Sequence, residues 1–433
     1  MRHFLRQSRG ASKGSGLLRD SFGLMASGAV AQAVAFLIIP IVSRLYPPHM
    51  MGVTGLFMTI GGILLIPAGG RYEQALVVAP DRRQRRTLLS LTLCINLLFA
   101  LLLWGITLVV RPLLKGGTYA ELIPYLPLLP LYVLLTALFA AGSNYAVGEG
   151  AFTRLSVAKL IQGVGNSALK VLLPLFFSAS VWLLLAALLG SYLLGLLCFV
   201  GLAGLGSLCQ LTSSARAQMR TLARQYAAFP KYTIVQAGVN TLLASLLVLM
   251  LSYGYTTYHI GLVTMALMLA KTPLRTIADS LSQAYFHRAA RLKHNAEPLS
   301  PITRKVVRTW LWIALPAGLL LYLIMPWLIG VILEAQYAPV ADIIRLMLPL
   351  LLVSIPNSVL NVLPDVLGAQ RRHMQMQTLF LAVEFAALLL LLFLHLPLLT
   401  LIAVYFGVQL VDQVVYAVWL RALIRRYERT CPR

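Results

Sequence analysis

Apolar residues along the chain fall into twelve runs of about twenty residues, each bounded by charged residues, Pro or Gly. A helix needs roughly 20 mostly apolar residues to cross the hydrocarbon core of a bilayer, which is about 30 Å thick. The pattern therefore predicts an all-α, polytopic membrane protein with about 12 transmembrane helices. The predicted spans are residues 21–43, 52–70, 88–110, 122–141, 156–178, 181–205, 232–254, 260–284, 309–332, 342–363, 374–394 and 398–420.

The basic residues orient these spans, because Lys and Arg gather in the loops on the cytoplasmic side of a membrane. With the N-terminus placed inside, the cytoplasmic segments carry 29 of the 36 Lys and Arg residues. The outer segments carry three, namely Arg44, Arg111 and Lys115. A wrongly assigned span would destroy this alternation. We therefore expect both the N- and the C-terminus in the cytoplasm.

The overall composition excludes several other classes of protein. Only 11% of the residues are charged, against roughly 25% in a globular protein, and the mean hydropathy is +0.82. Four cysteines in 433 residues form no disulfide framework. Basic residues outnumber acidic ones by 36 to 13, which the orientation signal and attraction to anionic lipid headgroups explain. Membrane lipids are therefore expected partners, and nucleic acid is not.

The longest predicted inner loop divides the twelve spans into two sets of six. The expected organisation is a basic cytoplasmic N-terminus (1–20), an N-lobe (21–205), a cytoplasmic linker (206–231), a C-lobe (232–420) and a basic cytoplasmic tail (421–433). Six residues recur at an offset of 209: Ser43, Tyr46, Gly52, Leu65, Gln74 and Ala75 match Ser252, Tyr255, Gly261, Leu274, Gln283 and Ala284. A repeat of six helices relates its lobes by an axis along the membrane normal. Coincidence is the alternative.

Polar residues inside the predicted spans recur every four positions, which places them on one helix face. The stripes are Lys271, Arg275 and Asp279; Gln162, Asn166 and Lys170; Gln236 and Asn240; and Asn357, Asn361 and Asp365. Charges inside a membrane usually face a cavity or a partner, so we expect a polar, net-positive interior. Its basic members would be Lys170, Lys271, Arg275 and Arg345. The alternatives are interhelical hydrogen bonds for the amides, an Arg275–Asp279 ion pair, and an Arg345 that reaches the membrane interface.

Such an interior suits a substrate that carries both phosphate and sugar. Arg binds phosphate bidentately and Lys attracts it as a point charge, whereas amides both donate to and accept from sugar hydroxyls. A lipid-linked sugar diphosphate has both features and a tail that can stay in the bilayer. The sequence contains no ATP-binding loop and no cluster with metal-ligand spacing. We expect no cofactor and no metal, and coupling to H⁺ or Na⁺ stays open.

Two parts of the sequence resemble a known family. They are QAVAFLIIPIVSRLYPPHMMG (32–52) with RYEQALVVAP (71–80), and YAAFPKY (226–232) with residues 273–290. These stretches are similar to the polysaccharide transporter family, the O-antigen and lipid-linked oligosaccharide flippases of the multidrug/oligosaccharidyl-lipid/polysaccharide exporter superfamily. The resemblance implies two six-helix lobes, as in multidrug and toxic compound extrusion (MATE) transporters, around a cavity that works by alternating access. Arg44 and Glu73 lie in the best-matching stretches. Arg44, at the outer end of the first span, would act as a substrate ligand or a gate, and a headgroup anchor is the alternative role.

The resemblance implies a flippase and not an enzyme. It would move an undecaprenyl-diphosphate-linked oligosaccharide repeat unit across the bacterial inner membrane, for lipopolysaccharide or exopolysaccharide biosynthesis. Lys170, Lys271 and Arg275 would attract the diphosphate, and the amide stripes would contact sugar. The candidates for ion coupling or gating are Glu73, Asp279, Glu384 and Asp412. The polysaccharide polymerase machinery is a candidate partner.

Two alternatives remain open at this point. The first is a MATE-like small-molecule or drug antiporter, which would be expected to carry an acidic residue inside its first span; residues 21–43 contain none. The second is a membrane polysaccharide polymerase or ligase. Such enzymes generally have a large outer loop with charged catalytic residues, whereas the outer loop 111–121 is short.

Overall fold

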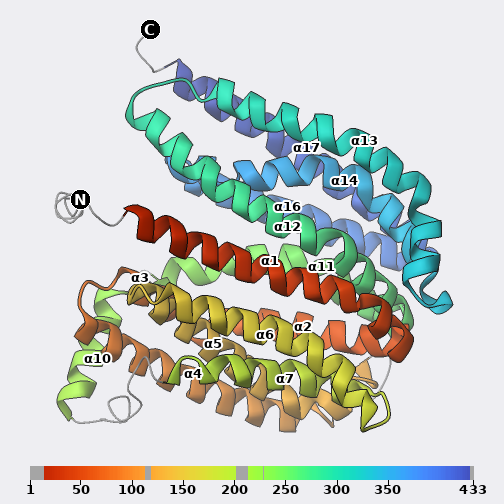
Figure 1. The fold of residues 1–433 in the computed structure, drawn as a ribbon, viewed down its shortest axis with the longest axis horizontal. Coiled ribbons are helices and arrows are strands. Elements are labelled where there is room, and N and C mark those ends of the chain that lie inside the picture. The colour runs from red at the N-terminus through yellow and green to blue at the C-terminus, as the bar shows by residue number, and fades with distance from the viewer. Residues whose placement is uncertain (1–13, 113–118, 201–212, 228, 430–433) are drawn as a thin grey trace.

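The computed structural model describes residues 14–112, 119–200, 213–227 and 229–429, and the regular structure within these ranges is helical. Figure 1 shows two bundles of long helices, an N-lobe coloured red to yellow-green and a C-lobe coloured green to blue. Parts of the expected terminal segments and linker, the end of the sixth span and Lys115 lie outside the described residues.

Within the described residues, each lobe contains six long helices and a few short ones. The N-lobe has α1 (Gly14–Leu45), α2 (Pro48–Ala68), α3 (Tyr72–Val78), α4 (Arg82–Val110), the 3-10 turn η3 (Ile123–Leu128), α5 (Leu129–Gly148), α6 (Phe152–Leu172), η4 (Leu173–Leu175) and α7 (Val181–Leu197). After α10 (Ser213–Gln225), the C-lobe has η5 (Phe229–Thr233), α11 (Ile234–Gly254), α12 (Thr257–His294), α13 (Ser300–Ile332), η6 (Ala335–Tyr337), α14 (Val340–Leu360), α15 (Leu363–Leu367), α16 (Gln370–Phe393) and α17 (Leu398–Glu428). The long helices match the predicted spans one for one, which confirms the expected fold class.

Not every predicted span is equally apolar. Nine helical segments of the described chain are long and apolar enough to cross a membrane. The other predicted spans correspond to α6, α7 and α12. Helix α7 has 17 residues, and α6 and α12 carry two of the polar stripes, which lower their hydropathy. All three belong to the same bundles as the apolar helices, where protein neighbours can satisfy polar side chains.

Several helices extend past the predicted spans on the predicted cytoplasmic side. Helix α12 continues to His294 and α17 to Glu428. Charged residues keep a segment out of lipid but do not stop it from being helical, because the backbone hydrogen bonds are internal. For the same reason part of the linker expected between the lobes forms α10. This helix packs on the N-lobe, where the Tyr72 hydroxyl donates to the Ala223 carbonyl oxygen at 3.1 Å.

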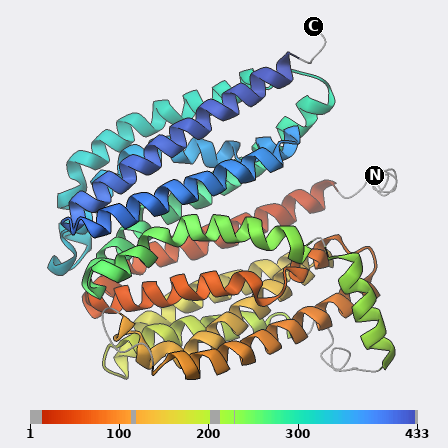
Figure 2. The ribbon, with the colours of Figure 1, turned by 180° about the vertical axis from the view of Figure 1, so that it is seen from behind.

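The two lobes converge at one end and diverge toward the end where α1 begins and α17 ends (Figure 1 and, from behind, Figure 2). At the converging end α2 and α12 cross with their backbones in contact. A Cβ atom on Gly52 would lie 1.8 Å from the carbonyl oxygen of Thr257, and one on Gly261 would lie 1.8 Å from that of Pro48. Only glycine fits at either position at this separation, as is usual where membrane helices approach closely.

This crossing is reciprocal and follows the repeat in the sequence. Pro48 and Thr257, the first residues of α2 and α12, are separated by the same 209 positions as Gly52 and Gly261. Gly52 thus faces Thr257, and Gly261 faces Pro48, which is the residue that corresponds to Thr257 in the repeat. Reciprocal contacts of this kind are those of a two-fold interface. The recurrence of glycine therefore has a structural cause, since both lobes contribute the same helix to the crossing.

Hydrogen bonds between the lobes gather around this crossing. They join the Tyr337 hydroxyl to the Tyr46 carbonyl oxygen (2.7 Å), the Glu334 N–H to Ser43 Oγ (3.3 Å), the Thr257 hydroxyl to the Glu121 carboxylate (2.7 Å), and Tyr119 Oη to Ser252 Oγ (2.8 Å). An apolar core shared by α1, α2, α11, α12 and α14 surrounds them. The converging end is thus closed by backbone contact, hydrogen bonds and a common core.

We expect Gly52→Ala to destabilise the closed end. A methyl group has no room beside the Thr257 carbonyl oxygen, so the two helices must separate, at a cost of about 1–3 kcal/mol. Thermal unfolding of the detergent-purified protein measures the loss. Gly62→Ala is the matched control on the same helix, because its Cβ would have no neighbour within 4 Å. Equal melting temperatures for the two variants would contradict the close crossing.

Candidate functional site

A polar cavity of about 340 Å³ lies inside the C-lobe, between α11, α12, α14, α16 and α17. It collects residues from five different spans that the sequence singles out as candidates. These are Asn240, Lys271, Arg275, Asp279, Asn357, Asn361, Glu384 and Asp412. The helices of this lobe therefore bring together eight of the predicted site residues in one place.

A hydrogen-bonded carboxylate, Glu384, lines this cavity. One oxygen of Glu384, a residue 5% exposed, accepts hydrogen bonds from the Tyr405 hydroxyl at 2.7 Å and from Gln409 Nε2 at 2.9 Å. Gln409 Nε2 also lies 2.9 Å from the Tyr405 hydroxyl oxygen. Glu384 comes from α16 and its two partners from α17, so the cluster ties these helices together. Hydrogen bonds of this kind offset the cost of taking a carboxylate out of water.

Two charged groups of the cavity have unused bonding capacity. Asp412 is 7% exposed, and its Oδ2 atom has no hydrogen-bond partner among the described residues. Lys271, on α12, makes no ion pair in the described chain, although the opposite charge of Glu384 attracts it. A buried carboxylate oxygen and an ammonium group that are not fully bonded can both take up a ligand, an ion or a proton.

Two of the amides are already bound to their neighbours. Asn357 Nδ2 donates to the Gln413 carbonyl oxygen at 2.7 Å and to Gln413 Oε1 at 3.0 Å. Asn361 Oδ1 accepts from the Tyr416 hydroxyl at 2.7 Å. These bonds hold α14 and the residue that ends it against α17. For Asn357 and Asn361 the structure therefore supports the interhelical alternative, whereas Asn240 is exposed on α11 and lines the cavity.

The charge of this cavity differs from the expected net-positive interior. Its lining contains two cations, Lys271 and Arg275, and three carboxylates, Asp279, Glu384 and Asp412. Arg275 and Asp279 form the ion pair expected from their spacing, at 3.9 Å and with side chains 72% and 66% exposed. A pair this exposed contributes at most about 1 kcal/mol. The C-lobe cavity is therefore rich in acids, because α16 and α17 add carboxylates that the basic stripe on α12 does not reveal.

The remaining predicted residues lie away from this cavity. Arg345 lies on the outside of the C-lobe, with Asp342 at 3.6 Å, the Tyr322 carbonyl oxygen at 2.8 Å and the Tyr322 ring at 5.1 Å. Arg44 is exposed in the last turn of α1, and Gln236 is exposed on α11. The four basic residues expected in a common interior are thus separated, since Lys170 belongs to the other lobe.

Lys170 and its two amide companions form a second polar stripe, on α6 of the N-lobe. Gln162 Nε2 lies 3.5 Å from Ser191 Oγ on α7, and Asn166 Oδ1 is buried without a hydrogen-bond partner among the described residues. The backbone carbonyl of Lys170 accepts from the Tyr46 hydroxyl at 3.1 Å. The three residues share one face of α6, but none of them lines the C-lobe cavity.

Glu73 lies in a smaller pocket of about 120 Å³ between α2, α4, α5 and α11. Arg71 is 3.7 Å from its carboxylate, and Asn96, which is 2% exposed, has both amide atoms without a hydrogen-bond partner in the described chain. Burial raises the pKa of the Glu73 carboxyl, and a backbone hydrogen bond and Arg71 oppose this only in part. Asn96 is a single amide in an apolar helix, so no spacing pattern in the sequence reveals it.

The sequence reasoning also missed most of the polar face of α17. Tyr405, Gln409, Asp412 and Tyr416 follow one another at helical spacing and line the C-lobe cavity, together with Gln413. The four-residue spacing of Tyr405 and Gln409 is the same signal that reveals the stripe on α12. Inclusion of Tyr among the polar residues would have found this face. No group of three His, Cys, Asp or Glu side chains among the described residues has the arrangement of a metal site.

Comparison with known families decides the classification. Residues 41–342, more than half of the chain, match a family described as polysaccharide biosynthesis protein. The chain belongs to this family. No curated protein shows a significant match to the sequence.

The fold is shared with solved transporters of low sequence identity. An inward-facing multidrug resistance transporter of the MATE family, in the MOP superfamily, superposes with a TM-score of 0.69 at 16% identity, over 93% of this chain and 96% of that chain. A MOP superfamily transporter from Pyrococcus furiosus superposes with a TM-score of 0.59 at 18% identity, over 95% of this chain and 96% of that chain. Its binding pocket is described as having a reverse polarity that suggests a different function. An outward-facing multidrug resistance transporter of the MATE family superposes with a TM-score of 0.56 at 15% identity, over 95% of this chain and 96% of that chain. This polysaccharide biosynthesis family member is thus a multi-pass membrane protein with a MATE-like fold.

We expect replacement of Glu73 by Gln to change the pH dependence of unfolding. Because burial raises the pKa of this carboxyl, the unfolded chain releases the proton at lower pH than the folded protein. Stability contributed by Glu73 is therefore lost as the pH rises from the ordinary pKa of a carboxyl through the raised one. Between about pH 4 and about pH 7, the melting temperature of Glu73→Gln should therefore fall less than that of the wild type.

Glu297→Gln, which changes an exposed carboxylate, is the control and should keep the wild-type profile. Parallel profiles for Glu73→Gln and the wild type would contradict a destabilising buried carboxyl.

Proposed function

We propose that the protein is a flippase that moves an undecaprenyl-diphosphate-linked oligosaccharide repeat unit across the bacterial cytoplasmic (inner) membrane, for lipopolysaccharide or exopolysaccharide biosynthesis. The observation that carries the proposal is the combination of a polysaccharide biosynthesis family with a transporter fold. A polysaccharide pathway needs its membrane-bound intermediate to change leaflets. A chain made of two helix bundles suits that step better than glycosyl transfer.

The arrangement of the lobes supports a transport cycle. The lobes are closed by the Gly52–Gly261 crossing at one end and diverge at the other. Residues 43–52 and 252–261 belong to the predicted outer side, so the lobes diverge toward the predicted cytoplasm. Alternating access would require this crossing to separate while the opposite ends approach one another. A substrate could enter from the inner leaflet in the observed form.

The C-lobe cavity supplies groups for both the substrate and the driving ion. Lys271 and Arg275 are exposed on α12 and carry positive charge that a diphosphate would neutralise. Asn240 adds an amide for a sugar hydroxyl. Glu384 and Asp412 lie deeper and would take up a proton or Na⁺. Because Lys271 attracts Glu384, an anion bound to Lys271 would weaken that attraction and so couple the two sites.

The carboxylates also favour a second candidate function, a small-molecule antiporter. Three acids in one cavity would suit a cationic substrate as well as a coupling ion. The two functions differ in what a deletion strain accumulates. A flippase mutant retains complete, unpolymerised repeat units on the inner leaflet, whereas an antiporter mutant becomes sensitive to a small molecule and keeps its surface polysaccharide. Repeat units that reach the outer face but stay unpolymerised would instead indicate a polymerase or ligase.

Lys271→Ala is expected to reduce glycan export by about tenfold or more, since one charge-assisted contact to phosphate is lost. Surface polysaccharide and the lipid-linked intermediate are measured in a deletion strain complemented with each variant at equal membrane levels. Lys271→Arg keeps the charge and should retain most export. Arg345→Ala removes a charge on the outside of the C-lobe and should export normally. Wild-type export by Lys271→Ala would remove Lys271 from the substrate site.

Glu384→Gln and Asp412→Asn are each expected to abolish the dependence of transport on an imposed H⁺ or Na⁺ gradient. Neither amide can exchange a proton, and each weakens cation binding by the loss of one negative charge. Proteoliposomes with and without a gradient give the two rates. The matched control is Asp279→Asn, which removes an exposed carboxylate of the same cavity. If the double variant Glu384→Gln, Asp412→Asn still responds to the gradient, the coupling site lies elsewhere.

A further inference from the structure

A wide groove runs between α13 and α17 on the outer face of the C-lobe. Its volume is about 780 Å³, and Ser300, Thr303 and Ile424 form part of its floor. Helices α13 and α17 lie at the edge of the C-lobe farthest from the N-lobe in both views (Figure 1 and Figure 2). The groove is therefore separate from the C-lobe cavity and from the region between the lobes.

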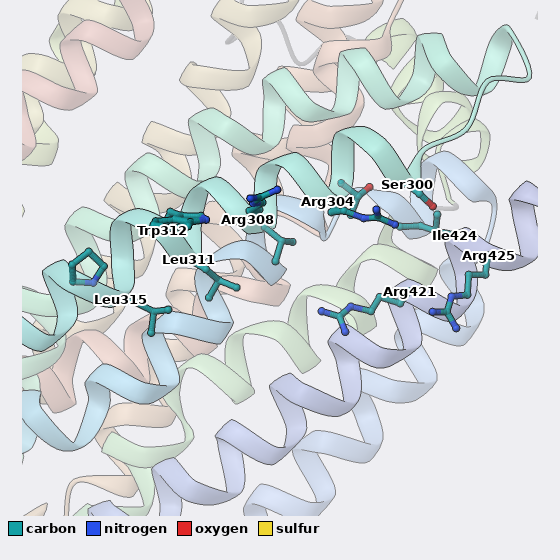
Figure 3. A pocket seen from close by; sticks show the side chains of 12 residues that line it. Ser300, Arg304, Arg308, Leu311, Trp312, Leu315, Arg421, Ile424 and Arg425 are labelled. Atoms are coloured by element: carbon teal, nitrogen blue, oxygen red, sulfur yellow. The ribbon is translucent and has the colours of Figure 1, made fainter.

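Four arginines line one end of this groove. Arg304 and Arg308 come from α13, and Arg421 and Arg425 come from α17 (Figure 3). Each pair is spaced by four residues, so its two side chains lie on the same face of their helix. All four residues are exposed, and in the part of the chain that the structure describes none of their side chains has an ion-pair or hydrogen-bond partner.

The nearby acid, Glu428, forms no ion pair with these arginines. The Glu428 carboxylate accepts a hydrogen bond from the backbone N–H of Ser300 at 2.7 Å and another from the Ser300 hydroxyl. It thereby caps the first turn of α13. Among the described residues that line the groove there is no carboxylate, so the lining itself is purely basic at this end.

The other end of the groove is apolar. Leu311, Trp312 and Leu315 line it on α13 and are exposed. Trp312 lies eight residues beyond Arg304, which corresponds to about 12 Å along a helix. The exposed apolar surface of α13 continues through Leu319, Leu323 and Trp327. The groove thus places a cluster of cations at the end of a membrane helix and apolar side chains next to them, deeper in the predicted span.

We propose that this groove binds an anionic bilayer phospholipid whose headgroup carries two phosphates. One phosphate would contact Arg304 and Arg308, and the other Arg421 and Arg425, since a guanidinium group binds phosphate bidentately. The acyl chains would lie along Trp312 and Leu315. The arginines lie at the end of the predicted span and the apolar residues lie deeper in it. This arrangement matches a lipid whose headgroup is at the predicted cytoplasmic interface. The bound lipid would join α13 to α17 by neutralising two facing pairs of cations.

The choice of a resident phospholipid over the diphosphate of a glycan carrier rests on position. A lipid in this groove is covered by α13 and α17 on one side and faces the bilayer on the other. Helix α14 packs against both α13 and α17, and the basic stripe of α12 lines the C-lobe cavity and not this groove. A substrate held here would be outside any path between the lobes.

The test uses the full-length protein, stripped of lipid in detergent and titrated with single lipids. Native mass spectrometry measures binding and thermal unfolding measures stabilisation, with diphosphatidylglycerol, phosphatidylglycerol and phosphatidylcholine as probes. Diphosphatidylglycerol should bind one per chain, raise the melting temperature, and bind at least about tenfold more tightly than phosphatidylcholine. Arg304→Gln with Arg421→Gln should lose this preference. Arg371→Gln with Arg372→Gln, exposed on α16, removes the same charge and should keep it.

The melting temperature of each variant without lipid shows whether it is folded before its binding is interpreted. If the groove variant is unfolded, Trp312→Ala replaces it and should weaken binding while leaving all four arginines in place. Equal losses in the groove and control variants would overturn the proposal in favour of non-specific attraction to basic residues. Displacement of diphosphatidylglycerol by an equimolar polyprenyl diphosphate would overturn it in favour of the glycan carrier.

Discussion

The backbone contact between Gly52 and Gly261 is the constraint on which the arrangement of the two lobes depends. Inside a bilayer, lipid chains are as apolar as leucine, so helices associate through close packing and not through exclusion of water. The crossing allows α2 and α12 to approach until each glycine touches a carbonyl oxygen of the other helix. The hydrogen bonds of Tyr337, Thr257 and Ser252 across the lobes, and the shared apolar core, form around that approach. The closed end therefore depends on glycine, which has no side chain, at both positions.

A second constraint is that polar groups at membrane depth must find partners in the protein. In the C-lobe this requirement is met by bonds between helices, from Tyr405 and Gln409 to Glu384 and from Asn357 to Gln413. These bonds hold α14 and α16 against α17 and leave Lys271 and one oxygen of Asp412 without full partners. Polar groups that join helices and polar groups with unused bonding capacity therefore line the same cavity.

The charge distribution of the C-lobe has two opposite parts. The cavity inside it combines two cations with three carboxylates, whereas the groove on its outer face combines four arginines with none. An interior with both signs can hold an ion, a proton or an anionic group in turn, which suits a transport cycle. A purely basic surface groove next to apolar side chains suits a stationary anionic lipid. The excess of basic residues in the chain thus includes four arginines gathered in one surface groove.

The sequence by itself determined the number, order and approximate bounds of the long helices, because hydropathy and the lengths of apolar runs reflect contact with lipid. It also identified the pair Gly52 and Gly261 through their shared offset, and the polar faces of α6 and α12 through four-residue spacing. Only the tertiary structure decided which faces meet. It brought Lys271 and Glu384 into one cavity, placed Lys170 in the other lobe and Arg345 on the outside, and bound Asn357 to Gln413. Spacing along a helix defines a face, but the partner of that face depends on how helices pack, which no local pattern contains.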